Sequence, residues 1–259
     1  LDTSEVNSDM IDMNAVFADK REQLIFASNR TGFYELWGSK NKQIAKLTQL
    51  KADVIERPIL NSKQSKLAFT STKLNETFLR ILDIDAAEII GTYKFDNRIH
   101  LLNWQINDKA IFYSASSTHR SAIYRFALEP RHSVPVMLDA GLLYQKESDE
   151  TELYGQISSV SLMAKQPSGE VSLMSDIPGS ALPLRPHQVS ILDGRFYYPD
   201  RQKGQKILVE HQFDNNQFKH VLTLPEDAYV TQIGKADNVF VIYDQLVDND
   251  KQLVMTQLP

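Results

Sequence analysis

Short apolar runs alternate with polar residues along the whole chain. The runs are four to seven residues long, rich in Ile, Val, Phe, Tyr and Thr, and separated by Asn, Asp, Ser and Lys. Such runs are typical of β-strands. No segment keeps apolar residues at helical spacing over ten or more positions, which disfavours a helical repeat. The pattern therefore predicts an all-β protein.

A repeat of about 43 residues organises these runs. Its central positions are Phe26, Phe69, Phe112, Gly155, Tyr197 and Phe240. Each unit reads as four short strands joined by polar turns, and four strands in such a repeat are typical of a propeller blade. We expect a six-bladed β-propeller with four-stranded antiparallel blades, forming a single domain over residues 1–259. The predicted blades lie near residues 14–50, 56–95, 98–140, 142–178, 185–224 and 228–259.

The two ends of the chain are expected to share a blade. The sixth unit supplies only three strands, near residues 229–233, 239–244 and 252–257, whereas residues 1–6 are a surplus stretch before the first blade. A closed propeller avoids exposed sheet edges when the missing strand comes from the other terminus. We therefore predict that residues 1–6 complete the last blade.

Composition narrows the functional classes. The net charge is −5 and no run of Lys or Arg occurs, so we expect no direct nucleic-acid contact. Cysteine is absent, which excludes disulfides and thiolate chemistry. No apolar stretch approaches the roughly 20 residues that span a bilayer. The chain starts at Leu1 without a signal sequence, so we expect a processed chain or a piece of a longer protein.

Catalytic motifs are missing from the sequence. It contains no Gly-x-Ser-x-Gly elbow and no glycine-rich phosphate loop, and its histidines lack zinc-site spacing. We therefore expect a protein that is not an enzyme and needs no cofactor or metal. Two acidic clusters lack the spacing of a calcium loop and are expected to be solvated loop charge; they are Glu147, Asp149, Glu150 and Glu152, and Asp244, Asp248 and Asp250.

One class of positions is a candidate binding site. The residue before each blade's first strand is expected on the rim of the central channel, twelve positions before each aligned position. These residues are Asn14, Arg57, His100, Leu143, Arg185 and Ala228, and the hairpins of the same face add Arg30, His119, Arg120 and Arg201. The predicted site consists of Asn14, Arg57, His100, Arg185, Arg30 and Arg120. Such a rim would bind an anionic group or an acidic peptide; alternatively, each arginine pairs with a neighbouring carboxylate.

Most aromatic residues are expected to fill the space between blades. This prediction covers Trp37, Trp104, Tyr124, Tyr197 and Tyr198. Phe33 and Tyr34 follow a glycine in a hairpin and are the predicted exceptions.

The first blade carries a family signature. The segment FADKREQLIFASNRTGFYELW, followed by IAKLTQL, resembles the WD40-like (PD40) repeat of the TolB-type propeller family, and weaker copies are NSKQSKLAFTSTKLN and QINDKAIFYSASSTHR. The Ser-Pro-Asp-Gly turn usual in that family is replaced, for instance by the residues Ala18 to Arg21. The resemblance implies a scaffold used in periplasmic TolB-type proteins, in peptidase propellers, and in extracytoplasmic sensor domains of membrane-anchored winged-helix regulators of the CadC and ToxR type.

Two functional hypotheses follow. The first is a non-enzymatic sensor or protein-interaction propeller, the extracytoplasmic (periplasmic) signal-receiving part of a bacterial transcriptional regulator. Its partner would be a protein or a small anionic ligand, and it would reach the membrane only through a missing upstream anchor. The alternative is a TolB-like periplasmic adaptor, or the gating or catalytic propeller of a peptidase or lyase, for which His100, Arg57 and Arg185 are the convergent set.

Overall fold

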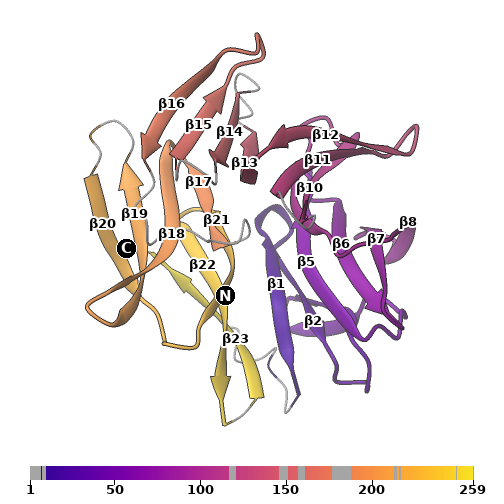
Figure 1. The fold of residues 1–259 in the computed structure, drawn as a ribbon. Helices are drawn as coiled ribbons and strands as arrows, with labels where there is room; N and C mark the ends of the chain where they lie inside the picture. Colours follow the sequence, from indigo (N-terminus) through magenta and orange to yellow (C-terminus); the bar gives the residue numbers. More distant parts are fainter. Residues whose placement is uncertain are drawn as a thin grey trace. The chain divides into compact units, whose positions relative to one another are not determined.

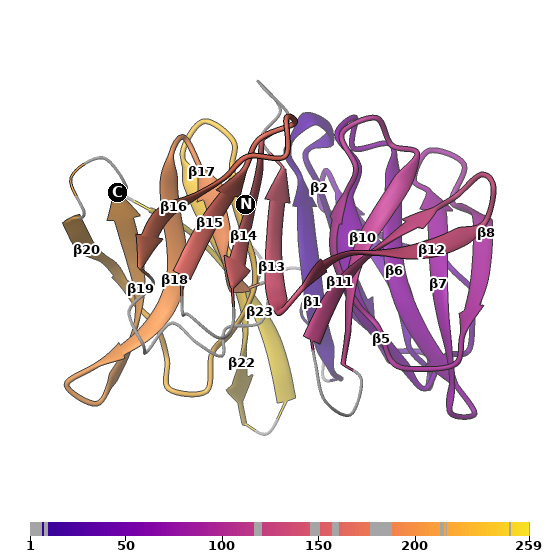
Figure 2. The same ribbon diagram turned by 45° about the horizontal axis from the view of Figure 1, so that its top comes forward.

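The structure is a computed structural model that describes residues 7, 10–116, 121–145, 151–156, 161–176, 188–212, 215, 217–248 and 250–258. Apart from short 3₁₀ turns such as η1 (Asp19–Arg21), regular structure in these residues is β-strand, arranged in six antiparallel sheets (Figures 1 and 2). The predicted fold class, a six-bladed β-propeller, is confirmed. No described helix is long and apolar enough to cross a membrane.

The chain divides into two compact units, and the first comprises Leu1–Arg98 with Pro225–Pro259. Its first sheet contains β1 (Asp12–Ala18), β2 (Gln23–Ser28), β3 (Glu35–Lys40) and β4 (Gln43–Lys46). The second contains β5 (Val54–Leu60), β6 (Lys66–Lys73), β7 (Glu76–Asp83) and β8 (Glu88–Phe95). The third contains β21 (Tyr229–Lys235), β22 (Val239–Val247) and β23 (Asp250–Gln257).

The second unit is Ile99–Leu224 and also holds three sheets. They are β9 (His100–Trp104), β10 (Ala110–Ser116), β11 (Ser121–Ala127) and β12 (His132–Leu138); β13 (Ala140–Gln145), β14 (Glu152–Gln156), β15 (Ser161–Lys165) and β16 (Val171–Asp176); and β17 (Ser190–Leu192), β18 (Arg195–Gln202), β19 (Gln205–Gln212) and β20 (Gln217–Thr223).

The last sheet has three strands among the described residues, as the sequence predicts. The stretch expected to complete it, residues 1–6, lies outside the described residues. The next described residue, Asn7, contacts the outer strand β23. Its side-chain amide donates to the Leu253 carbonyl (3.1 Å), and its side-chain oxygen accepts from the Leu253 N–H (2.9 Å).

The apolar run of β2 is buried because this strand lies between the sheets of β6 and β22. In β2, Leu24 and Phe26 join a cluster with Phe240 of β22, whereas Ile25 joins a cluster with Phe69 of β6. Successive residues of a strand point to opposite faces, so one run of six residues supplies two interfaces. This double burial explains why the aligned positions are continuous apolar runs rather than simple alternations.

The three sheets of the first unit share an orientation, which defines two faces. The Asn14 side chain donates to the Ile55 carbonyl (2.9 Å), and the Phe17 N–H donates to the Gln232 side-chain oxygen (2.6 Å), so β1, β5 and β21 begin at the same end. We call this end the start face. Because neighbouring strands are antiparallel, the hairpins β2–β3, β6–β7 and β22–β23 also turn there. The opposite end is the return face.

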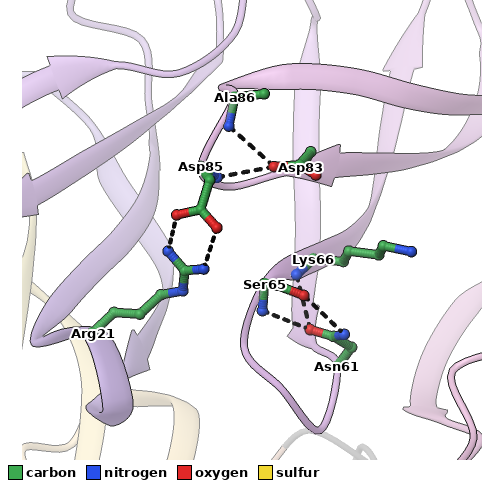
Figure 3. Close-up of polar contacts among 7 residues, drawn as sticks. All are labelled: Arg21, Asn61, Ser65, Lys66, Asp83, Asp85 and Ala86. Carbon is green, nitrogen blue, oxygen red and sulfur yellow. Dashed lines mark hydrogen bonds and ion pairs between the residues drawn. The ribbon is translucent and has the colours of Figure 1, made fainter.

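The return face is closed by polar contacts. Figure 3 shows Arg21, just after β1, forming a two-pronged ion pair with Asp85 in the β7–β8 turn. In the β5–β6 turn the Asn61 side-chain oxygen accepts from the backbone N–H groups of Ser65 (2.9 Å) and Lys66 (2.8 Å). The Arg21–Asp85 pair joins turns of two adjacent sheets, whereas the Asn61 bonds stabilise the β5–β6 turn itself.

Candidate functional site

Arg30 is the best-defined charged group on the start face. One guanidinium nitrogen lies 2.9 Å from a carboxylate oxygen of Asp12, which is fully buried at the start of β1. Its Nε donates to the Ser28 hydroxyl (3.0 Å), and the guanidinium carbon lies 5.1 Å and 5.0 Å from the ring centroids of Phe26 and Trp37. Cation–π stacking and the ion pair together fix this side chain in one orientation. For Arg30 the carboxylate partner predicted as the alternative is therefore present.

The hairpin that carries Arg30 is also tied to β1. Asn29 accepts a hydrogen bond from the Ile11 N–H through its side-chain oxygen (3.0 Å), and the Asn29 N–H donates to the Ile11 carbonyl (3.3 Å). The turn closes with a bond from the Gly32 N–H to the Asn29 carbonyl (2.7 Å). Gly32 has a φ of 90°, which favours glycine. The loop is thus pre-organised for contact with a partner.

Asn14 joins three sheets. It interrupts β1 with a β-bulge and a left-handed backbone (φ 54°), a conformation that asparagine tolerates. Its side chain reaches β5 through the Ile55 carbonyl, and its backbone N–H interacts with the Asp244 carboxylate of β22. The predicted rim residue therefore lies at the start face, where its role is to connect neighbouring blades.

Asp244 corrects one prediction. It was expected to be solvated loop charge, but only 2% of its surface is exposed, because β22 continues past it and places it on the buried face of Phe240 and Ile242. Burial raises its pKa to about 7, although Lys251, 3.7 Å away, and the Asn14 N–H act in the opposite direction. One carboxylate oxygen has no hydrogen-bond partner among the described residues. The alternation Phe240, Ile242, Asp244 is the sequence signal that indicates this burial.

The other acidic residues are placed differently. Asp248 is exposed at the β22–β23 turn, and Glu152 lies 3.5 Å from Lys165 on the neighbouring strand. Glu147, Asp149 and Glu150 lie outside the described residues. Among the described residues no group of three or more histidine, aspartate or glutamate side chains could hold a metal ion.

The remaining predicted rim residues are only partly described. The backbone of Arg57 lies in β5 beside Glu56, and His100 begins β9, where it pairs with Ser114. Leu143 lies in β13, Ala228 is fully buried before β21, and Arg201 is exposed in β18. Arg185, His119 and Arg120 lie outside the described residues. The shared rim of Arg57, His100 and Arg185 stays a prediction.

The second unit contains a polar cluster that the sequence analysis missed. On one face of the β18–β19 pair, the Tyr197 hydroxyl donates to Glu210 (2.9 Å), and Arg195 and Gln212 each approach the other carboxylate oxygen at 3.1 Å. Burial and the adjacent carboxylate raise the pKa of Tyr197 to about 12. Burial alone would raise the pKa of Glu210, but its hydrogen bonds and the Arg195 charge lower it. Tyr197 stays protonated and Glu210 ionised at neutral pH, which is the pattern of a structural ion pair.

The aromatic predictions are largely confirmed. Trp104, Tyr197 and Tyr198 are buried, and Trp37 packs against the cluster between the first and last sheets. Phe33 is 49% exposed, as expected for an exception. Tyr34 is not an exception: it packs against the core between β2 and β6, because its backbone pairs with Ala52 and turns the ring inward.

Comparison with known proteins finds similarity in fold but not in sequence. No protein-family profile matches the chain, and no curated protein matches it in sequence. Three solved structures are similar in fold. TolB from Acinetobacter baumannii has a TM-score of 0.62 at 14% identity over 86% of this chain. An oligogalacturonate lyase in complex with manganese has a TM-score of 0.62 at 10% identity over 94% of this chain. The β-propeller domain of the Trilobed protease from Pyrococcus furiosus has a TM-score of 0.58 at 14% identity over 94% of this chain.

These likenesses show a TolB-like β-propeller fold. The chain spans 57% of the TolB chain, 88% of the lyase chain and 81% of the protease propeller. The fold hosts binding proteins and enzymes alike, so function must be argued from the surface of this chain.

Proposed function

We propose that the chain is a non-enzymatic binding domain, the extracytoplasmic signal-receiving part of a bacterial transcriptional regulator. The observation that carries this proposal is the start face of the first unit, where Arg30 and the Asn29 hairpin are held in place by Asp12, Ser28 and Ile11. A surface that is rigid before it meets a partner loses little conformational entropy on binding. On the return face, by contrast, Arg21 is paired with Asp85 and the Asn61 side chain is bonded within its own turn.

The proposed ligand class follows from the predicted rim. Arg57 and Arg185 would supply positive charge in a chain of net charge −5, and arginine binds carboxylates and phosphates through paired hydrogen bonds. The partner is then a protein or a small anionic ligand, without nucleic-acid contact by this segment.

A calorimetric titration tests this proposal. The chain would be titrated with defined sets of small carboxylates, phosphates and acidic peptides, comparing wild type with the Arg57→Ala/Arg185→Ala variant. The double variant Lys63→Ala/Lys109→Ala removes two exposed charges from turns that precede second strands and serves as the control. We expect binding that only the arginine variant abolishes. Equal binding by both variants contradicts the rim, and no heat with any compound contradicts the anionic ligand.

A second candidate is an enzyme acting within the propeller. It is favoured by the likeness to the oligogalacturonate lyase, because this chain spans 88% of that chain and therefore most of its fold. Incubating the purified chain with oligogalacturonate and Mn²⁺ separates the two candidates. Formation of unsaturated products at a rate above the buffer control would replace the binding role with a lyase activity.

A further inference from the structure

Exposed apolar side chains gather on the start face of the first unit. Of the large apolar residues that are exposed in the described part of this unit, all but Ile90 lie at that end: Met10 (40%), Phe33 (49%), Leu74 (81%) and Leu246 (55%). Met10 precedes β1, and the other three lie in the hairpins β2–β3, β6–β7 and β22–β23. Three adjacent sheets therefore each have one exposed apolar side chain in their start-face hairpin. We call Phe33, Leu74 and Leu246 the apolar tips of these sheets.

Leu74 is the most informative of these residues. It forms a two-residue turn with Asn75, and both have a left-handed backbone (φ 50° and 65°) between the paired residues Lys73 and Glu76. This turn geometry favours Asn, Asp or Gly, and Asn75 fits that preference. Among the described residues Leu74 is the only large apolar residue with positive φ. The position is thus unfavourable for leucine in two ways, through its backbone and through its exposure.

An unfavourable conformation that the surroundings hold in place is a mark of function. The Leu74 N–H donates to a carboxylate oxygen of Asp53 (2.8 Å), just before β5. The last sheet repeats this arrangement, since the Leu246 N–H donates to the Asp227 carboxylate, which precedes β21. In the first sheet, the bonds between Asn29 and Ile11 hold the hairpin that ends in Phe33. Each tip is therefore anchored to the segment before the first strand of its sheet.

The charges around these tips indicate the chemistry of the partner. Near Leu246, Glu226, Asp227 and Asp248 are exposed, and the neighbouring Lys251 lies 3.7 Å from the buried Asp244. The tip on the last sheet therefore stands in a negative field. Near Leu74, Glu76 pairs with Lys94, and the exposed Lys73 and Asp53 carry opposite charges, so neither sign dominates there. A partner that places basic side chains over the last sheet would be attracted to this face.

We infer that the start face of the first unit docks a protein partner whose apolar side chains are flanked by Lys or Arg, with Leu74, Phe33 and Leu246 as its anchors. This inference rests on the proposed binding role and assigns it a second surface, the hairpin ends, whose partner chemistry differs from that of the anionic ligand proposed for the rim. Exposed apolar side chains on rigid hairpins lose little conformational entropy on binding.

A peptide-display library is the probe that tests this surface. Peptides selected on the wild-type chain would be synthesised, and their affinities compared among wild type, Leu74→Asn, Leu246→Asn and Ile90→Asn. Ile90 lies in the outer strand β8 with 50% exposure and is the matched control. We expect peptides that combine apolar or aromatic residues with Lys or Arg, at least tenfold weaker binding to Leu74→Asn, and unchanged binding to Ile90→Asn.

The Leu74→Asn variant carries its own folding control. Asparagine suits the turn better than leucine, so the melting temperature should stay equal or rise by about 2–4 °C while binding falls. Peptides that bind both hairpin variants as tightly as wild type would refute this surface and leave a binding role elsewhere. Acidic selected peptides, or self-association of the chain that Leu74→Asn abolishes, would overturn the stated partner. A library that yields no peptide contradicts this surface, whereas the small anionic ligand of the proposed function is tested separately by the calorimetric titration.

Discussion

Replacing Asp244 by asparagine should stabilise the protein at neutral pH and leave it unchanged in acid. The carboxyl is 2% exposed, and burial raises its pKa from 3.8 to about 7. Between these two values the native state binds a proton that the unfolded chain does not. The contribution of Asp244 to stability is therefore present at low pH and is lost as the pH rises through about 7.

The size of the effect follows from the pKa difference. A rise from 3.8 to about 7 corresponds to about 4 kcal/mol in the free energy of unfolding at pH values above 7. Asparagine has the shape of the protonated acid and can still accept from the Asn14 N–H. Lys251 is 41% exposed and 3.7 Å from Asp244, so loss of this ion pair offsets little of the gain.

Urea unfolding followed by tryptophan fluorescence measures this difference. Wild type and Asp244→Asn would be compared at about pH 3, below the ordinary aspartate pKa of 3.8, and at about pH 8. The difference in unfolding free energy is the quantity of interest. We expect near equality at the lower pH and a more stable variant at the higher pH. A difference that does not change with pH would refute the raised pKa, and a variant less stable at both values would mean that the carboxylate is satisfied in its ionised form.

Two further substitutions test packing and buried hydrogen bonds in the first unit. Gly234→Ala should lower stability by about 1–3 kcal/mol, because an added methyl would clash with the Phe240 ring, and urea unfolding measures the loss. Glu35→Ala should cost about 2 kcal/mol, because the buried carboxylate accepts from the Thr48 hydroxyl (2.7 Å) and the Lys51 N–H (2.8 Å). A thermal melt that is unchanged in the second variant would show that water replaces these bonds.

Much of the fold could be predicted because it depends on local patterns. The regular spacing of Phe26, Phe69 and Phe112 predicts strands that are buried on both faces. The structure confirms that these three side chains are buried. A strand between two neighbours needs apolar residues at every position, whichever blade it belongs to. The repeat of these runs therefore predicts the number of blades and the shorter last sheet.

The candidate site depended on tertiary structure. Arg30 and Asp12 are 18 residues apart in sequence, and their contact arises only because β1 and β2 pair in register. Asp244 is predicted to be a loop charge, yet the extension of β22 buries it, whereas Lys251 of β23, 3.7 Å away, stays 41% exposed. Whether a charged side chain is solvated depends on the residues packed around it, and these residues come from segments that are distant in the sequence.

Local sequence by itself determined that the chain forms short strands, where most of them lie, and that aromatic residues fill the space between blades. It did not determine which end of a sheet is tied by contacts between turns and which end carries exposed apolar side chains. That distinction arose when Arg21 met Asp85 at one face and when Asp53 held Leu74 outward at the other. Strand formation is governed by neighbours in the chain, whereas a binding surface is made by side chains that folding brings together from separate segments.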